Sequence, residues 1–295
     1  KNNIFLIKDL KLDSNFKIID VRLVKLDYVN NNKFQNQINL IKKKEKYEIY
    51  GKNFDASKLI SEILHDDNKD GLSFFKDLNS IFNIKIIKTY LNKDTSVNNL
   101  NGNITIKKNK VHKLSLLSTF SNKKELNLTI NTNNNKEKIT TLFSGYPKPL
   151  VKQYKFIKGF EEGVLDYYSI KKNDVSNSVL KIDNFKIQEV PALARLLTLA
   201  SLQGIADVLT GEGIRFDNFE MKFSNNKKLM QIDEMYAIGP AISILMEGYI
   251  EEKKLTSLKG TLVPATTINK AIGSIPLLGD ILVGKKIGEG VFGVS

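Results

Sequence analysis

The chain has 295 residues, 41% of them hydrophobic and 26% charged, which is the composition of a folded protein and not of a disordered one. It lacks cysteine, so disulfides, thiolate metal sites and cysteine nucleophiles are excluded. The formal net charge is +13, but arginine occurs only three times, and arginine is the residue best suited to contact phosphates and guanine bases. We therefore expect no nucleic-acid partner. The lysines, scattered among asparagines, indicate a solvated surface or one that faces anionic lipid.

Alternation of apolar and polar residues, the pattern of a strand with one buried face, recurs along the first half of the chain. Turns rich in Asn, Lys and Gly separate the alternating segments. Two short helices are expected at residues 56–64 and 72–82, on either side of a polar loop. The strands are predicted at residues 16–28, 103–107, 114–120 and 126–130.

The same alternation continues in the second half, where three helix signals interrupt it. A weak one follows Pro147 at residues 148–156, and the strongest covers residues 191–209, with Pro at its start and Gly just after its end. The third, residues 267–282, is divided by Gly273 and Pro276. Because long crossover helices are few, we predict a mainly β, antiparallel fold, with further strands at residues 180–187, 214–223, 242–250 and 258–262.

The apolar residues of these later strands are expected to share one face of the sheet. Two interpretations fit them, namely the filled core of a closed sandwich and the wall of a groove in an open sheet that holds a lipid chain. The sequence alone does not separate the two. The residues concerned are Leu180, Ile182, Phe185, Ile187, Phe216, Phe219, Met221, Phe223, Ile242, Ile244 and Met246.

Residues that would carry out catalysis are scarce. The two histidines, His65 and His112, have no acidic or histidine neighbour at metal-ligand spacing, and the sequence contains neither a glycine-rich phosphate loop nor a nucleophile elbow. Residues 66–77 have the spacing of a calcium loop, but Asp77 stands where Glu is usual, and a polar turn between helices uses the same residue types. We expect a protein that is not an enzyme and that has no catalytic residue, cofactor or metal.

Short motifs follow one another in a fixed order towards the end of the chain. They are residues 182–187 (IDNFKI), 191–197 (PALARLL), 211–216 (GEGIRF), 260–264 (GTLVP), 275–279 (IPLLG) and 288–293 (GEGVFG). In order and spacing they resemble the C-terminal region of the AsmA-like family, the group of bacterial intermembrane lipid-transport proteins that includes AsmA, TamB and YhdP. The resemblance is strong over residues 146–295 and weaker over residues 1–145.

The resemblance implies an elongated, curled antiparallel sheet, U-shaped in section, with an apolar concave groove and a few short amphipathic helices. It implies a periplasmic conduit that supports phospholipid transport between the inner and outer membranes, with acyl chains in the groove. The alternative is a non-enzymatic assembly or scaffolding factor in outer-membrane protein biogenesis. Because the chain starts at Lys1 and its last segment stops in mid-pattern, we expect one elongated region, residues 1–295, truncated at both ends and lacking its N-terminal inner-membrane anchor.

The apolar segment 267–282 has two interpretations of its own. It is either a cap that packs on the end of the sheet or an amphipathic element that dips into the outer-membrane interface. Lys270, Lys285 and Lys286 flank it and suit anionic headgroups. The residues expected to contact the membrane are Ile275, Leu277, Leu278, Ile281 and Leu282.

Overall fold

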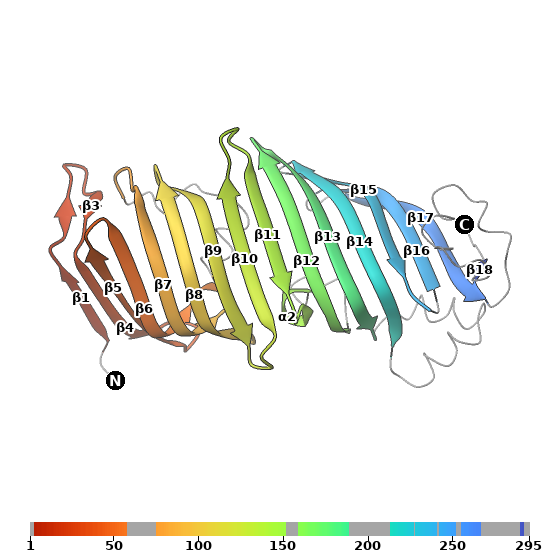
Figure 1. Ribbon diagram of the computed structural model, residues 1–295, viewed down its shortest axis with the longest axis horizontal. Helices are drawn as coiled ribbons and strands as arrows, with labels where there is room; N and C mark the ends of the chain where they lie inside the picture. The colour runs from red at the N-terminus through yellow and green to blue at the C-terminus, as the bar shows by residue number, and fades with distance from the viewer. Residues whose placement is uncertain are drawn as a thin grey trace. The chain divides into compact units, whose positions relative to one another are not determined.

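A computed structural model describes residues 3–57, 75–151, 159–188, 213–226, 228–240, 242–251, 255–266 and 290–291 (Figure 1). The chain divides into two compact units, which we call unit 1 (Lys1–Phe143) and unit 2 (Ser144–Ser295). In both units the described residues lie mostly in strands. Within the described residues, no helix has the length and apolar character needed to cross a membrane.

Unit 1 is an open sheet in which most neighbouring strands are also neighbours in sequence. All pairs with an assigned register are antiparallel except β6 and β7, which run parallel. A small hairpin of β2 (Lys11–Leu12) and β3 (Ile18–Asp20) lies outside this sheet. In sheet order the strands are β1 (Ile4–Lys8), β4 (Leu23–Val29), β5 (Gln35–Lys43), β6 (Lys46–Asp55), β7 (Ser80–Tyr90), β8 (Ser96–Lys107), β9 (Lys110–Phe120), β10 (Glu125–Thr132) and β11 (Lys138–Ser144).

One turn geometry recurs between the strands of unit 1. In the turn from Asn30 to Phe34, the amide of Asn30 donates to the carbonyl of Phe34 and the amide of Lys33 donates to the carbonyl of Asn30. The fourth residue, Lys33, has a positive φ of 63°. The turns 13–17, 120–124 and 133–137 repeat this pattern, with Phe16, Lys123 and Lys136 at the positive φ. Such a turn fixes the register of the strands that it joins.

Unit 2 is a sheet of longer antiparallel strands. One turn of helix, α2 (Lys148–Val151), precedes it. The strands are β12 (Phe160–Lys172), β13 (Val175–Ile187), β14 (Ile214–Asn226), β15 (Leu229–Ile238), β16 (Ile242–Glu251), β17 (Leu255–Thr266) and β18 (Gly290–Val291), each paired with the next.

The mainly β, antiparallel fold predicted from the alternation is confirmed, and strands occupy the predicted segments. The curl of the sheet, its concave groove and the single elongated region stay predictions. Of the helix predictions, α2 accounts for the start of residues 148–156, whereas residues 58–74, 191–209 and 267–282 lie outside the described residues.

The predicted helix at residues 72–82 is wrong over its described part. Phe75 makes an isolated bridge with Ile18, and β7 begins at Ser80. The reason is that Phe82, Ile84 and Ile86 alternate with polar residues and are largely β-branched or aromatic, which suits a strand packed on a neighbour. Of the calcium-like loop at residues 66–77, residues 66–74 lie outside the described residues.

Candidate functional site

The register of unit 1 assembles a continuous apolar surface, which we call the apolar face of unit 1. Directly paired residues on neighbouring strands project from the same side of a sheet, so the pairings show which side chains share a face. Three rows of paired residues cross the sheet on that side. They are Val24, Leu40, Ile49, Ile84, Gly102, Leu116 and Leu128; Leu26, Ile38, Gly51, Ile86 and Leu100; and Tyr47, Phe82, Ile104, Leu114 and Ile130.

The middle of this face is packed, whereas its flanks keep apolar area accessible. Ile38, Ile84 and Ile86 are buried and form one cluster. Val24 and Leu128, at the two ends of the first row, are half-buried. Each further CH₂ that is removed from water there is worth about 0.8 kcal/mol. A flexible hydrocarbon chain is a ligand that this surface can bind.

The opposite face of unit 1 is mainly polar. One row on this face joins Leu6, Lys25, Asn39, Tyr50, Lys85, Asn101 and Leu117. Its middle is exposed and polar at Lys25, Lys85 and Asn101, whereas its two ends are exposed leucines. The continuous apolar rows therefore lie on one face of the sheet, and that face suits a hydrocarbon better than the other does.

Unit 2 carries a second apolar face, which contains the eleven residues predicted from the sequence. Leu180 pairs with Met221, and Met221 with Met235, which pairs with Met246. A parallel row joins Ile182, Phe219, Ala237 and Ile244. The remaining predicted residues take their places through the pairs Phe185–Phe216, Ile187–Ile214 and Phe223–Ile232, and through Ile242, two residues before Ile244.

A local irregularity keeps Phe185 on this face. Strict alternation from Ile182 would turn Phe185 to the polar side, because the two are three residues apart. Asn184 adopts a positive φ of 53°, and neither it nor Asp217, which stands opposite, belongs to a registered pair. The change of parity occurs here without a shift of register, and Phe185 packs edge-on against Phe219 with ring centroids 6.4 Å apart, which places it on the apolar face.

Burial divides the apolar face of unit 2 into a packed part and an accessible part. Phe216 is 1% exposed and Ile242 is fully buried. The rings of Phe160, Phe185 and Phe216 form a ladder with centroids 5.3 Å apart. The half-buried members of the predicted set are Leu180, Ile187, Phe219, Met221, Ile244 and Met246. These six offer apolar area to a ligand.

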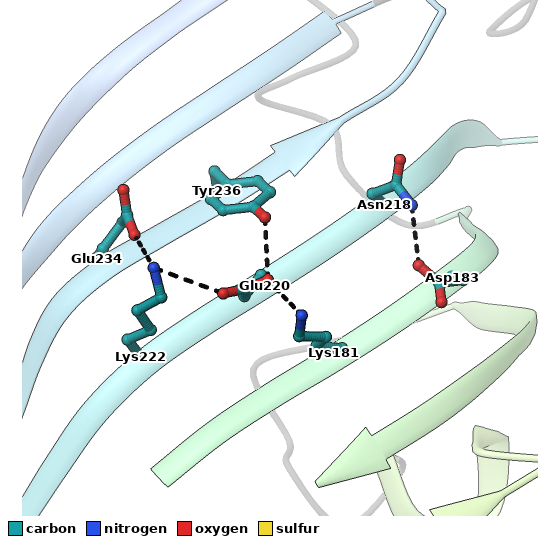
Figure 2. Close-up of polar contacts among 7 residues, drawn as sticks. All are labelled: Lys181, Asp183, Asn218, Glu220, Lys222, Glu234 and Tyr236. Atoms are coloured by element: carbon teal, nitrogen blue, oxygen red, sulfur yellow. Dashed lines mark hydrogen bonds and ion pairs between the residues drawn. The ribbon is translucent and has the colours of Figure 1, made fainter. Parts of the chain in front are cut away.

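The polar face of unit 2 carries a network of charged groups around Glu220 (Figure 2). Its carboxylate lies 3.0 Å from Nζ of Lys181 and 3.6 Å from Nζ of Lys222, and it accepts a hydrogen bond of 3.0 Å from the hydroxyl of Tyr236. Lys222 also contacts Glu234 at 2.8 Å. Burial acts to raise the pKa of Glu220, but the hydrogen bonds from Lys181 and Tyr236 and the lysine charges outweigh it and lower that pKa.

This network is suited to holding strands together and not to acid–base chemistry. The lowered pKa keeps Glu220 ionised, and its partners occupy its oxygens. Within the described residues, no group of three or more His, Asp or Glu side chains is placed to hold a metal ion. The predicted membrane contacts Ile275, Leu277, Leu278, Ile281 and Leu282 lie outside the described residues.

Comparisons with protein-family models, with curated proteins and with solved structures found no match.

Proposed function

We propose that this chain is a lipid conduit of the AsmA-like kind, which supports phospholipid movement between the inner and outer membranes of a bacterial envelope. The observation that carries the proposal is the two-sidedness of each unit. Rows of paired residues make one face apolar and the other mainly polar, and the apolar rows continue from strand to strand. A hydrocarbon chain can exchange one row for the next without a large change in contact area, which keeps the barrier to its movement low.

The periplasmic location, the inner-membrane anchor and the place in phospholipid transport come from the family-like motifs of residues 182–293. The geometry supports the part of the proposal that concerns acyl chains. Phospholipid acyl chains are the expected cargo, and the protein acts on them by binding and not by reaction.

Photocrosslinking tests this proposal in living cells. A photoreactive residue placed at the half-buried positions Leu40, Leu116, Leu180, Met221 and Met246 should form adducts with phospholipid. Exposed positions on the polar faces serve as matched controls, namely Asn83 and Asn103 in unit 1 and Asn177 and Gln231 in unit 2. Ser243 is unsuitable as a control although it projects from the polar side, because it is only 6% exposed.

Phospholipid adducts at the five apolar positions and not at the four controls support the proposal. Equal labelling of the two sets would contradict it. Mass spectrometry of lipids that co-purify with the chain then identifies the cargo.

A second candidate is the assembly or scaffolding role in outer-membrane protein biogenesis, and the edge strand β1 favours it. Among the described residues β1 pairs with β4 alone, and all five of its residues are exposed, including Phe5 at 64%. An unpaired apolar edge can take up a strand from another protein. Recovery of barrel-assembly components with the wild type but not with Leu6→Pro, from protein that carries no lipid, would favour this role over the conduit.

A further inference from the structure

One edge of the unit 1 sheet, formed by the ends of its strands and not by an outer strand, contains residues 43–46, 75–80, 107–110 and 132–138. We call these strand ends and turns the lysine rim. The pairings place them together. Lys43 pairs with Lys46 across the turn between β5 and β6, and Lys46 lies level with Ile81 because β6 and β7 run parallel. The turn between β8 and β9 follows on the same edge, since Ser80 pairs with Ile106. Strand β9 runs away from this edge and β10 runs back towards it, so the turn between β10 and β11 lies on the same edge.

The lysine rim is strongly basic. Among the described residues it contains nine lysines and three acidic residues, a formal charge of +6, and eight of the nine lysines are exposed. Two ion pairs lower this excess, from Lys43 to Glu48 at 2.7 Å and from Lys76 to Asp13 at 3.7 Å. Nine lysines against five acidic residues still leave a charge of +4.

The opposite edge of the same sheet is nearly neutral. It consists of residues 29–35, 55–57, 90–96 and 120–125, with four lysines and three acidic residues. The positive charge of unit 1 is therefore concentrated at one end of its strands. A uniformly solvated surface would show no such difference between the two edges.

His112 lies within reach of the lysine charges at this edge. It lies two residues into β9, next to the rim. Burial and then the nearby charges of Lys107 and Lys113 lower its pKa below the ordinary value. Lys107 of the rim and Lys113 just beyond it thus act electrostatically on a neighbouring group, and an anion there would be attracted by the same charges.

The chemistry of the rim fits an anionic surface and not a nucleic-acid sequence. Its described residues include no arginine, and lysine acts as a point charge without the fork that reads bases. From β5 to β10 the rim extends over roughly 24 Å, at about 4.8 Å per strand. The apolar face begins beside it, since Tyr47 follows Lys46.

We propose that the lysine rim docks unit 1 on a bilayer that contains anionic phospholipid, with the phosphate headgroups against the lysines. This inference rests on the proposed function and deepens it, because it names the class of lipid surface and the end of the sheet that meets it. Acyl chains of a docked lipid then lie next to the apolar face, which starts at the same edge.

The test compares two variants that lose the same charge from opposite edges. The rim variant carries Lys44→Gln, Lys107→Gln, Lys108→Gln and Lys110→Gln, and the control carries Lys33→Gln, Lys93→Gln, Lys123→Gln and Lys124→Gln. The match extends to the backbone, since Lys44 and Lys108 in one set and Lys33 and Lys123 in the other have positive φ. Binding of the full chain is measured to vesicles of phosphatidylcholine with and without phosphatidylglycerol.

We expect the wild type to prefer vesicles with phosphatidylglycerol and the rim variant to lose at least about tenfold in affinity for them, since one lysine near an anionic surface contributes roughly fivefold, or about 1 kcal/mol. The control variant should stay within about twofold of the wild type, because its lysines lie away from the docked edge. Equal losses in the two variants, or no preference of the wild type for phosphatidylglycerol, would overturn the proposal.

Two further measurements separate the lipid surface from other anions. If inorganic phosphate displaces the vesicles and chloride of equal ionic strength does not, the rim is a phosphate site and not a membrane contact. If the rim variant loses more affinity for single-stranded RNA than for vesicles, the partner is a nucleic acid. If the conduit proposal alone is wrong, vesicle binding stays intact but photoreactive residues at Leu40 and Leu116 form no adducts with acyl chains. That result differs from each of the two outcomes above.

Discussion

The hydroxyl of Tyr47 donates a hydrogen bond of 2.9 Å to Oδ1 of Asp20. The same oxygen accepts from Nζ of Lys42 at 2.7 Å. Tyr47 is 5% exposed and its ring stacks on Phe82 with centroids 4.9 Å apart. This contact joins the hairpin of β2 and β3 to the unit 1 sheet, because Asp20 is the last residue of β3 and Tyr47 lies in β6.

The Tyr47–Asp20 contact predicts a loss of stability in alkali. Burial, and then the hydrogen bond to Asp20, raises the pKa of Tyr47 to about 12, above its ordinary value of 10.0. Between these values the unfolded chain releases a proton that the folded chain keeps, so the free energy of unfolding falls by about 1.4 kcal/mol per pH unit. Urea unfolding of the wild type and of Tyr47→Phe from pH 9 to pH 12 measures this.

The variant should be less stable at neutral pH, because it lacks the hydrogen bond, and its stability should fall less steeply above pH 10. Parallel curves would contradict the prediction.

Asp20→Asn gives the complementary result in acid. The hydrogen bond from Lys42 is the largest influence that lowers the pKa of Asp20 below 3.8. The ionised Asp20 therefore stabilises the folded chain above pH 3.8, and this contribution is lost as the pH falls further.

Gly102 lies where two strands approach too closely for a side chain. A Cβ atom at this position would lie 1.9 Å from the carbonyl oxygen of Ser115 on β9. Because the neighbour is backbone and cannot rotate away, β8 and β9 must shift. We expect Gly102→Ala to lower the free energy of unfolding by about 2 kcal/mol or more, as overpacked sites do.

Asn103→Ala is the control for Gly102→Ala. It is the next residue on β8, it is exposed, and it pairs with Ser115 on the polar side. Its effect should stay within about 0.5 kcal/mol. Similar losses in the two variants, measured by chemical denaturation, would show that the close approach at Gly102 does not matter.

Much of the unit 2 sheet was predictable from sequence because its strands keep their alternation over long runs. Ile182, Phe219 and Ile244 each sit in such a run, and the register joins them in one row. The change of parity at Asn184 is harder to foresee. A positive φ at Asn is a local choice, and the sequence of β13 does not by itself show that Asn184 adopts it.

The apolar face of unit 1 was missed because its rows depend on pairing and not on any single segment. Ile49 and Ile84 become neighbours through a parallel pair whose strands are separated by residues 56–79, and nothing local specifies that pairing. The wrong prediction of a helix at residues 72–82 has the same cause, namely contacts between residues that are distant in sequence. Phe75, Leu78 and Phe82 repeat at helical spacing, but Leu78 and Phe82 pack in one cluster with Val21 and Tyr47, which are distant in sequence.

The aromatic ladder of unit 2 predicts where that unit is most sensitive to a cavity. Phe216 is 1% exposed and stacks on Phe185. Its truncation to Ala should lower the free energy of unfolding by about 3–5 kcal/mol, the usual loss for a buried Phe. Phe5→Ala is the control, since Phe5 is 64% exposed, and it should cost less than about 1 kcal/mol. Thermal or urea unfolding that ranks the two variants in the opposite order would contradict this assignment of the core.

Lys33 offers the opposite kind of test, a substitution that should stabilise the fold. It occupies the fourth position of the turn 30–34 with a φ of 63°, where an L side chain meets the following carbonyl and costs about 1–2 kcal/mol. Glycine avoids this strain but loses about 0.5–1 kcal/mol through the greater freedom of the unfolded chain. The balance predicts that Lys33→Gly raises the free energy of unfolding by about 0.5–1 kcal/mol. Lys25→Gly, within β4 and also exposed, should lower it by a similar amount, because no positive φ is relieved there. Denaturation curves of the two variants decide the matter, and a loss of stability in Lys33→Gly would show that the lysine is not strained in this turn.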